Sequence, residues 1–195
     1  MFIELTDHLR CPEDHAESFL VLLPDQMDGR SVRTGRLGCP VCHRTFTLLD
    51  GIAQLGDAPA PTADQTRLDP EGLTALAGLS GPGGYFALVG PVASLGKGFQ
   101  EANAGVGLVA VNPSADVGDA PGISVIRSRR IPLKTRSMRG VALGPPYAGD
   151  PFWIAEAARV VLPGLRVVGE GVDPPADAIE LMASADGVWV GTAKR

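Results

Sequence analysis

Three cysteines and one aspartate near the start of the chain have the spacing of a tetrahedral metal site. Cys39 and Cys42 stand two residues apart in the run CPVC. Cys11 opens the similar run CPED, which puts Asp14 at the position of a fourth ligand. Two thiolates at this spacing reach one zinc ion from the same side, and a second pair of ligands completes a structural site. The pattern therefore predicts that these four residues bind zinc.

The fourth ligand and the metal itself are open to other interpretations. His15 and His43 each neighbour one of these positions and offer an alternative fourth ligand. A carboxylate oxygen is a harder ligand than a thiolate, which weakens the zinc interpretation of Asp14. The alternative is a metal-free ribbon whose buried thiols pack as small apolar groups. The residues alone leave both interpretations open.

A run of small and polar residues divides the chain into two parts. Residues 58–66 read APAPTADQT and have no apolar periodicity, which is typical of a linker. We expect a small module at 1–57, with a net charge of −4, and a larger domain at 67–195. So small a module encloses little apolar surface of its own, so we expect it to dock onto the larger domain within the same chain.

The small module has the pattern of a β-rich unit. An apolar run at 18–24 predicts a strand. Asp50-Gly51 interrupts a partly alternating run at 44–55, as the turn of a hairpin does. A short helix is expected at 4–10.

The larger domain alternates between continuous apolar runs and helical patterns. This order is typical of an α/β fold with a parallel-type sheet and helices on both faces. The clearest helix has Asp150 as its cap, Pro151 as its first residue and Pro163-Gly164 as its stop. The expected strands are 84–90, 106–114, 122–128, 138–144, 165–171 and 187–194, and the expected helices are 94–104, 150–164 and 175–185.

The small module resembles the zinc-ribbon proteins that activate tRNA, rRNA and protein methyltransferases. The shared pattern combines a Cys-Pro-x-Cys run, an aromatic residue, aliphatic positions and Asp-Gly-Ile. Here it is carried by Cys39, Cys42, Phe46, Leu48, Asp50, Gly51, Ile52 and Leu55. The metal-binding members have cysteine where this chain has Asp14. The resemblance covers 1–57 and implies a ribbon that stabilises a methyltransferase by packing on its sheet.

The larger domain is similar to class I, S-adenosylmethionine-dependent methyltransferases. The likeness is clearest at 131–171, which corresponds to the family's fourth strand, the helix after it and the turn into the fifth strand. Arg159, Val160, Leu162, Pro163 and Gly164 match that turn, and Leu165 replaces its second glycine. The resemblance implies a Rossmann-like, methyltransferase-type sheet behind the zinc-ribbon-like module.

The positions with which that family binds S-adenosylmethionine are largely changed. Gly90 keeps one place of the glycine-rich loop, but Leu88 stands where an acid orients the cofactor. Asn112 replaces the acid that binds the ribose hydroxyls, and the run RSRR at 127–130 replaces the acid near the adenine. The resemblance thus leaves Gly90 and Asn112 as the cofactor-binding candidates.

Three missing carboxylates argue against cofactor binding, because each buried polar partner contributes about 1 kcal/mol or more. We therefore expect a pseudoenzyme: a non-catalytic pseudo-methyltransferase that acts as a scaffold or regulatory binding protein, without catalytic residues. The alternative is an active S-adenosylmethionine-dependent methyltransferase with an atypical cofactor loop.

Charge and composition bound the partners and the compartment. Residues 127–139 hold six basic residues and no acid, which leaves a protein or an RNA partner open. The alternative is a solvated loop, which the lack of interleaved aromatic residues for base stacking favours. The net charge of −5 gives no signal for DNA. No run reaches the roughly 18 apolar residues of a membrane helix. The odd number of cysteines and the lack of a signal-peptide pattern favour the cytoplasm.

Overall fold

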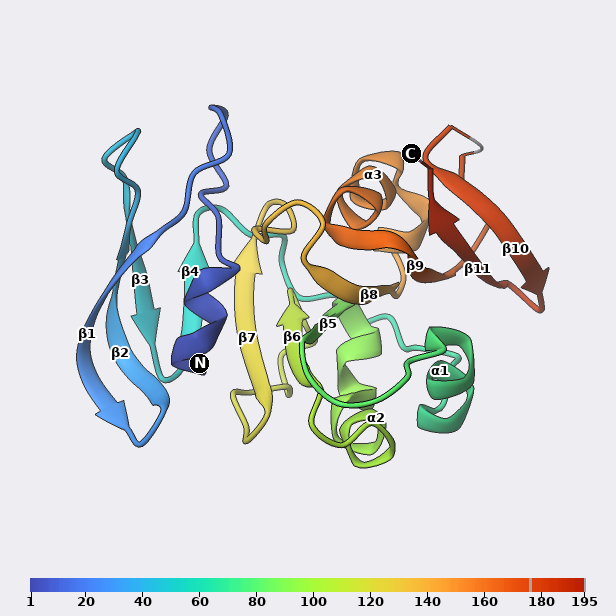
Figure 1. Ribbon diagram of the computed structural model, residues 1–195, viewed down its shortest axis with the longest axis horizontal. Helices are drawn as coiled ribbons and strands as arrows, with labels where there is room; N and C mark the ends of the chain where they lie inside the picture. Colours follow the sequence, from blue (N-terminus) through green and yellow to red (C-terminus); the bar gives the residue numbers. More distant parts are fainter. Residues whose placement is uncertain (176, 195) are drawn as a thin grey trace.

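One continuous sheet runs through both parts of the chain in this computed structural model (Figure 1). Its eleven strands follow the order β1-β2-β3-β4-β7-β6-β5-β8-β9-β11-β10. The structure describes residues 1–175 and 177–194. Ala176, in the expected third helix, and Arg195, the last residue of the expected larger domain, therefore lie outside the described residues.

The small module contributes four antiparallel strands. They are β1 (Val21–Asp28), β2 (Ser31–Gly38), β3 (Thr45–Leu49) and β4 (Ile52–Leu55), preceded by the 3₁₀ helix η1 (Ile3–Asp7). The predicted hairpin turn is confirmed, since Asp50 and Gly51 have φ angles of 51° and 78°, the left-handed values that such a turn requires. Strand β2 was not expected, because its two glycines weaken the strand pattern.

The larger domain contributes seven strands and three α-helices. The strands are β5 (Tyr85–Val89), β6 (Gly107–Val111), β7 (Ile123–Ser128), β8 (Met138–Leu143), β9 (Val161–Glu170), β10 (Ile179–Ala185) and β11 (Val188–Ala193). The helices are α1 (Pro70–Ala77), α2 (Gly96–Ala102) and α3 (Pro151–Val160), with short 3₁₀ turns η2 (Gly90–Leu95) and η3 (Tyr147–Gly149). Strands β5 to β9 run parallel, and β11 pairs antiparallel with both β9 and β10.

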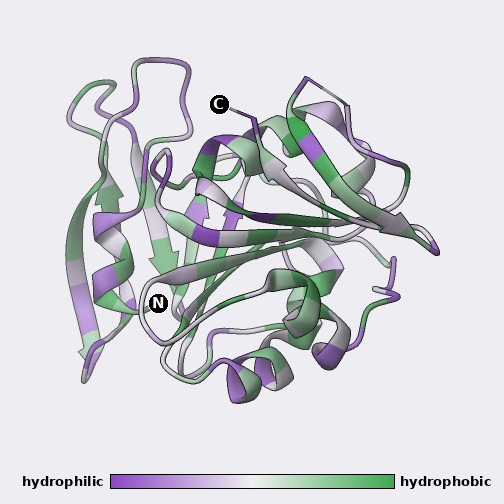
Figure 2. Ribbon diagram, turned by 45° about the vertical axis from the view of Figure 1, so that its right-hand side comes forward, coloured by the Kyte–Doolittle hydropathy of each residue, from purple (hydrophilic) through white to green (hydrophobic). Residues whose placement is uncertain are grey.

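Both faces of the parallel strands are buried, as their continuous apolar sequences predict. In β5, Phe86 and Leu88 pack with α1 and α2 on one face, whereas Ala87 and Val89 pack with α3 on the other. Green, apolar stretches accordingly run along the central strands in Figure 2. The predicted α/β fold class is confirmed. None of the helices in the described residues is long and apolar enough to cross a bilayer.

Helix α3 begins as predicted and ends early. The Asp150 carboxylate accepts a hydrogen bond from the Phe152 N–H at 2.9 Å, and Pro151 is the first helical residue. The helix ends at Val160, and the next residue already belongs to β9. The expected stop at Pro163-Gly164 therefore lies inside an irregular start of β9, where the register with β8 shifts.

The expected helix at 175–185 is wrong. Residues 179–185 form β10, which pairs with β11 from Ile179↔Ala193 to Ala185↔Val188. Glu, Leu, Met and Ala in this run are good helix formers, but intrinsic propensity is a weak constraint, and pairing with the adjacent strand overrides it.

The two parts of the chain meet through a parallel strand pair. Strand β4 pairs with β7 from Ile52↔Val125 to Leu55↔Ser128. Leu55 is fully buried, in the same apolar cluster as Ile126 and Trp153 of the larger domain. The small module therefore shares both a strand ladder and a core with the larger one, and cooperative unfolding of the two is a prediction that follows.

Replacing Leu55 by alanine is expected to cost about 2–5 kcal/mol of unfolding free energy. Because the two parts share one core, the loss should appear in the fluorescence of Trp153 and Trp189, both in the larger domain. Leu49→Ala is the matched control: this residue of the same hairpin is 56% exposed, so its truncation should change stability by less than about 0.5 kcal/mol. An unchanged tryptophan melting transition in Leu55→Ala would mean that the two parts unfold independently.

Candidate functional site

Four potential metal ligands converge beside the end of β4. The ligand atoms of Cys11, His15, Cys39 and Cys42 all lie within 4.8 Å of one another. The first two come from the loop before β1, and the other two from the turn between β2 and β3. That turn is closed by the His43 N–H, which donates to the Cys39 carbonyl at 3.0 Å.

The spacing of these atoms fits a tetrahedral zinc ion. Zinc–sulfur bonds of about 2.3 Å and zinc–nitrogen bonds of about 2.05 Å imply S···S and S···N distances of about 3.8 and 3.6 Å at tetrahedral angles. The Cys11 and Cys42 sulfurs lie 3.7 Å apart, and the Cys39 sulfur lies 3.5 Å from His15 Nε2. The cluster of three cysteines and one histidine is therefore compatible with zinc.

The structure places Asp14 outside this cluster. Its side chain is 81% exposed, and its carboxylate faces Arg129 at 3.6 Å and Arg130 at 3.7 Å. The loop bends at 13–16, which turns His15 towards the sulfurs and Asp14 away from them. Of the two histidines that the sequence offers as alternatives, the structure brings His15 into the cluster, while His43 is exposed and lies outside it.

Two of the thiols differ in acidity. Burial raises the pKa of Cys39, but the backbone N–H groups of Cys42 and Val41 outweigh it and bring the pKa of this thiol to about 6. Burial, with a further contribution from the neighbouring Cys39 sulfur, raises the pKa of Cys11 to about 12. Cys39 is thus a thiolate at neutral pH, whereas Cys11 must release its proton when a metal binds.

The loop after β5 is occupied by the protein's own aromatic side chain. Gly90 has a φ of 76°, and a Cβ at this residue would lie 2.5 Å from Cδ2 of Tyr147. Tyr147 is only 3% exposed. Because Gly90 has no side chain, the Tyr147 ring can pack directly against its backbone at this carboxyl end of the sheet.

Asn112 joins two strands through both polar atoms of its amide. It is fully buried, its Nδ2 donates to the Ser128 carbonyl at 2.7 Å, and its Oδ1 accepts from the Ser128 N–H at 2.8 Å. Its φ of 49° is a left-handed value that asparagine tolerates. The side chain thereby extends the pairing of β6 with β7 beyond the last ladder bond, and both of its polar atoms are engaged.

The linker crosses the carboxyl ends of the parallel strands, and we call residues 58–66 the strap. It borders a cavity of about 520 Å³ together with Pro91 and Ser94 after β5 and residues 114–116 after β6. Pro59, Ala60 and Thr62 border a second cavity of about 410 Å³ with Tyr147 and Trp153.

A buried carboxylate holds the end of the strap. Glu170, at the carboxyl end of β9, is 4% exposed. It accepts hydrogen bonds from the Thr66 hydroxyl and, at 2.6 Å, from the Arg67 N–H. No sequence pattern indicates this contact, because the two segments lie more than a hundred residues apart.

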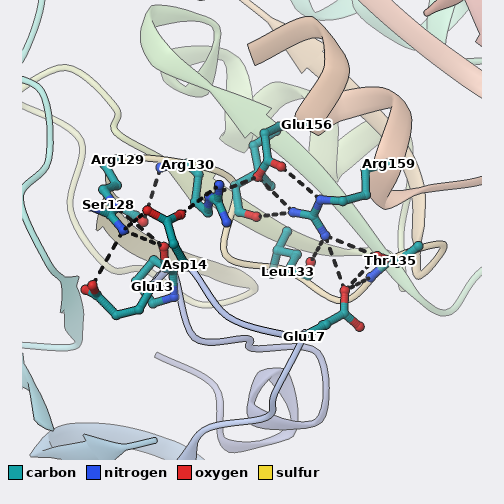
Figure 3. Close-up of polar contacts among 12 residues, drawn as sticks. Glu13, Asp14, Glu17, Ser128, Arg129, Arg130, Leu133, Thr135, Glu156 and Arg159 are labelled. Atoms are coloured by element: carbon teal, nitrogen blue, oxygen red, sulfur yellow. Dashed lines mark hydrogen bonds and ion pairs between the residues drawn. The ribbon is translucent and has the colours of Figure 1, made fainter. Parts of the chain in front are cut away.

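Most of the basic strip at 127–139 is engaged within the chain. Arg127 donates to the Pro113 carbonyl, and Arg139 donates to the carbonyls of Ser80, Gly81 and Gly83. Arg129 and Arg130 pair with the acidic residues Glu13 and Asp14 of the loop before β1 (Figure 3). An RNA partner for this strip therefore stays a prediction. The strip offers fewer basic side chains to such a partner than the sequence suggests.

Together, the parallel core and the Cys/His cluster define an α/β fold preceded by a small β module with a potential metal centre. No family model matches the chain, and no curated protein matches it. Solved structures show a distant similarity to class I S-adenosylmethionine methyltransferases.

Three solved structures illustrate this similarity. A geranyl diphosphate methyltransferase in complex with GPP and sinefungin is 17% identical over 51% of this chain and 42% of its own, with a TM-score of 0.44. The complex of the Haloferax volcanii Trm112 methyltransferase activator with a methyltransferase is 16% identical over 51% of this chain and 49% of its own, with a TM-score of 0.41. The pyocyanin biosynthetic protein PhzM is 12% identical over 65% of this chain and 55% of its own, with a TM-score of 0.48. This chain thus spans less than two thirds of each of them, and the similarity concerns the fold alone.

Replacing His15 by alanine is expected to lower zinc affinity by more than about tenfold, because it removes a ligand. Asp14→Asn is the matched control on the adjacent residue and should leave the affinity within about twofold, since ion pairs of so exposed a carboxylate contribute little. Competition with a chromophoric chelator measures both. If Asp14→Asn lowered zinc affinity more than His15→Ala does, Asp14 would be a zinc ligand and His15 would not.

Replacing Glu170 by glutamine is expected to loosen the strap. A hydrogen bond to a charged group contributes about 1.5 kcal/mol, so proteolytic cleavage within 58–66 should be about tenfold faster than in the unmodified protein. Glu180→Gln, on the exposed face of β10, is the control and should leave the cleavage rate unchanged. Equal rates in all three proteins would show that Glu170 does not fix the strap.

Proposed function

We propose that the protein is a non-catalytic, methyltransferase-like binding protein, in which a zinc ribbon is fused to the domain that it stabilises. The observation that carries this proposal is that residues of the chain itself occupy or cover the carboxyl edge of the sheet. In open α/β sheets this edge, near the point where the strand order reverses, is where ligands bind. Here that point lies between β5 and β8, where the Tyr147 ring packs on Gly90 and the strap borders the adjoining cavities.

The chemistry of this edge does not suit S-adenosylmethionine. A carboxylate at Asn112 could accept hydrogen bonds from both ribose hydroxyls, but the asparagine amide is already committed to Ser128. Leu88 is fully buried and offers no polar atom. Recruiting Asn112 to a ligand would leave backbone groups of Ser128 unpaired, at about 1–3 kcal/mol for each.

Access to the edge is also restricted. Tyr147 packs on Gly90, and the strap lies over the ends of β5 and β6. A ligand that approached the backbone of Gly90 would have to displace the Tyr147 ring, and the free energy of the lost ring contacts would weaken its binding.

The metal centre suits a structural role. Three cysteines and one histidine give four protein ligands, which fill the coordination shell of zinc and leave no position for water or substrate. Zinc would fix the β2–β3 turn to the loop before β1, and so stabilise the module that extends the sheet beyond β7. The proposed activity is therefore binding of a protein partner, supported by a rigid extended sheet.

Calorimetric titration with S-adenosylmethionine and S-adenosylhomocysteine tests the proposal. We expect no dissociation constant below about 1 mM, equivalent to about 4 kcal/mol of binding free energy. The Glu170→Gln variant should behave alike, since releasing the strap restores none of the missing carboxylates.

A second function, active S-adenosylmethionine-dependent methyl transfer, is favoured by one observation. The cavity of about 520 Å³ beside the ends of β5 and β6 is large enough for a small ligand. A micromolar dissociation constant in the unmodified protein, or cofactor retained through purification, would overturn the non-catalytic proposal in favour of this one. Micromolar binding that appears only in Glu170→Gln would identify the strap as the barrier.

A further inference from the structure

The loop that supplies half of the Cys/His cluster also forms a second contact between the two parts of the chain, beside the β4–β7 strand pair. Residues 8–18, which we call the metal loop, contain Cys11 and His15 and lie along residues 129–135, the segment that follows β7 (Figure 3). Between and beside the two ligands stand three acids, Glu13, Asp14 and Glu17, which face arginines of the larger domain. One short loop thus serves both the potential metal centre and the junction.

Backbone hydrogen bonds tie the first half of the metal loop to this segment. The His8 carbonyl accepts from the Lys134 N–H at 2.8 Å, and the Arg10 N–H donates to the Pro132 carbonyl at 2.9 Å. Arg129 donates to the carbonyl of Pro12, next to the ligand Cys11, at 3.2 Å. These contacts fix the main chain on both sides of Cys11.

Glu17 ties the second half of the loop to the same segment. Its Oε2 accepts from the Thr135 N–H at 3.0 Å and from the Thr135 hydroxyl at 2.6 Å, and Arg159 Nη1 lies 3.4 Å away. Arg159 belongs to α3, where both of its outer nitrogens also donate to the carbonyls of Ile131 and Leu133 at 2.8 Å. The loop, the segment after β7 and helix α3 therefore share one polar network.

Leu9 and Cys11 anchor the start of the metal loop in the apolar core, but its middle has no such anchor. None of its residues from 13 to 17 is buried, so no apolar anchor fixes this stretch. Segments with few buried contacts open locally at low free-energy cost. Coordination of Cys11 and His15 to the two cysteines of the β2–β3 turn would supply the missing constraint.

We propose that metal binding at the Cys/His cluster and docking of the metal loop on residues 129–135 are thermodynamically coupled, so that metal occupancy controls how firmly the two parts of the chain are joined. This inference rests on the zinc centre proposed above. Coupling is reciprocal: if zinc favours the docked loop, a docked loop must favour zinc by the same factor. A substitution in the larger domain, which supplies no ligand, should therefore lower zinc affinity.

The variant Arg129→Gln tests the first direction. It removes the donor to Pro12 from a side chain that is 42% exposed, so the fold should be retained, as circular dichroism will check. We expect its zinc affinity, measured by chelator competition, to fall about fivefold or more. Glu17→Gln should act in the same direction, because it weakens the contacts to Thr135 and Arg159.

Arg30→Gln is the matched control. Arg30 is 76% exposed and pairs with Glu4 inside the small module, away from the junction. Its removal should leave zinc affinity within about twofold. A fall as large as that of Arg129→Gln would show a general charge effect and overturn the coupling.

Hydrogen exchange of the unmodified protein tests the other direction. Chelation of zinc should speed exchange of the Arg10, Lys134 and Thr135 amides by at least fivefold, while amides of β11 keep their rates. Added zinc should restore protection. Zinc that binds at one ion per chain without changing these amides would overturn the coupling and leave the zinc centre standing. A protein that binds no zinc at all would overturn both.

Discussion

The parallel pairing of β4 with β7 is the constraint on which the remaining structure depends. An exposed β7 would present unpaired backbone groups to solvent, and the small module covers them by extending the sheet. Because the pairing is parallel, β4 ends at the carboxyl edge, where Leu55 aligns with Ser128. The next residues must therefore start at that edge, and this direction alone brings the strap across the ends of β5 and β6.

The same strand direction places the Cys/His cluster. Strand β3 is antiparallel to β4 and so begins at the edge where β4 ends, which puts the β2–β3 turn with Cys39 and Cys42 there as well. The segment after β7 leaves the sheet at that edge too. The metal loop and residues 129–135 are neighbours for this reason, and their acids and arginines pair across the junction (Figure 3).

Local sequence patterns predicted the strands of the larger domain well wherever both faces of a strand are buried. Strands β5 and β6 are buried on both faces and continuously apolar, and β7 and β8 are largely so, which is why the positions of these four strands follow closely from the sequence. Prediction was wrong where pairing overrode local preference: residues 179–185 read as a helix and form an edge strand, and β2 was hidden by its glycines. Solvent-facing strands carry too little apolar periodicity to reveal themselves.

The sequence by itself determined the fold class, the Asp50-Gly51 turn and the presence of a cysteine-based cluster, because each depends on residues that are close in the chain or on burial alone. Only the tertiary structure decided that His15 and not Asp14 joins the sulfurs, that Asn112 is committed to Ser128, and that Glu170 holds the strap. These outcomes depend on the direction of single side chains. A bend in a loop, or a partner a hundred residues away, sets that direction, and neither can be read from residue spacing.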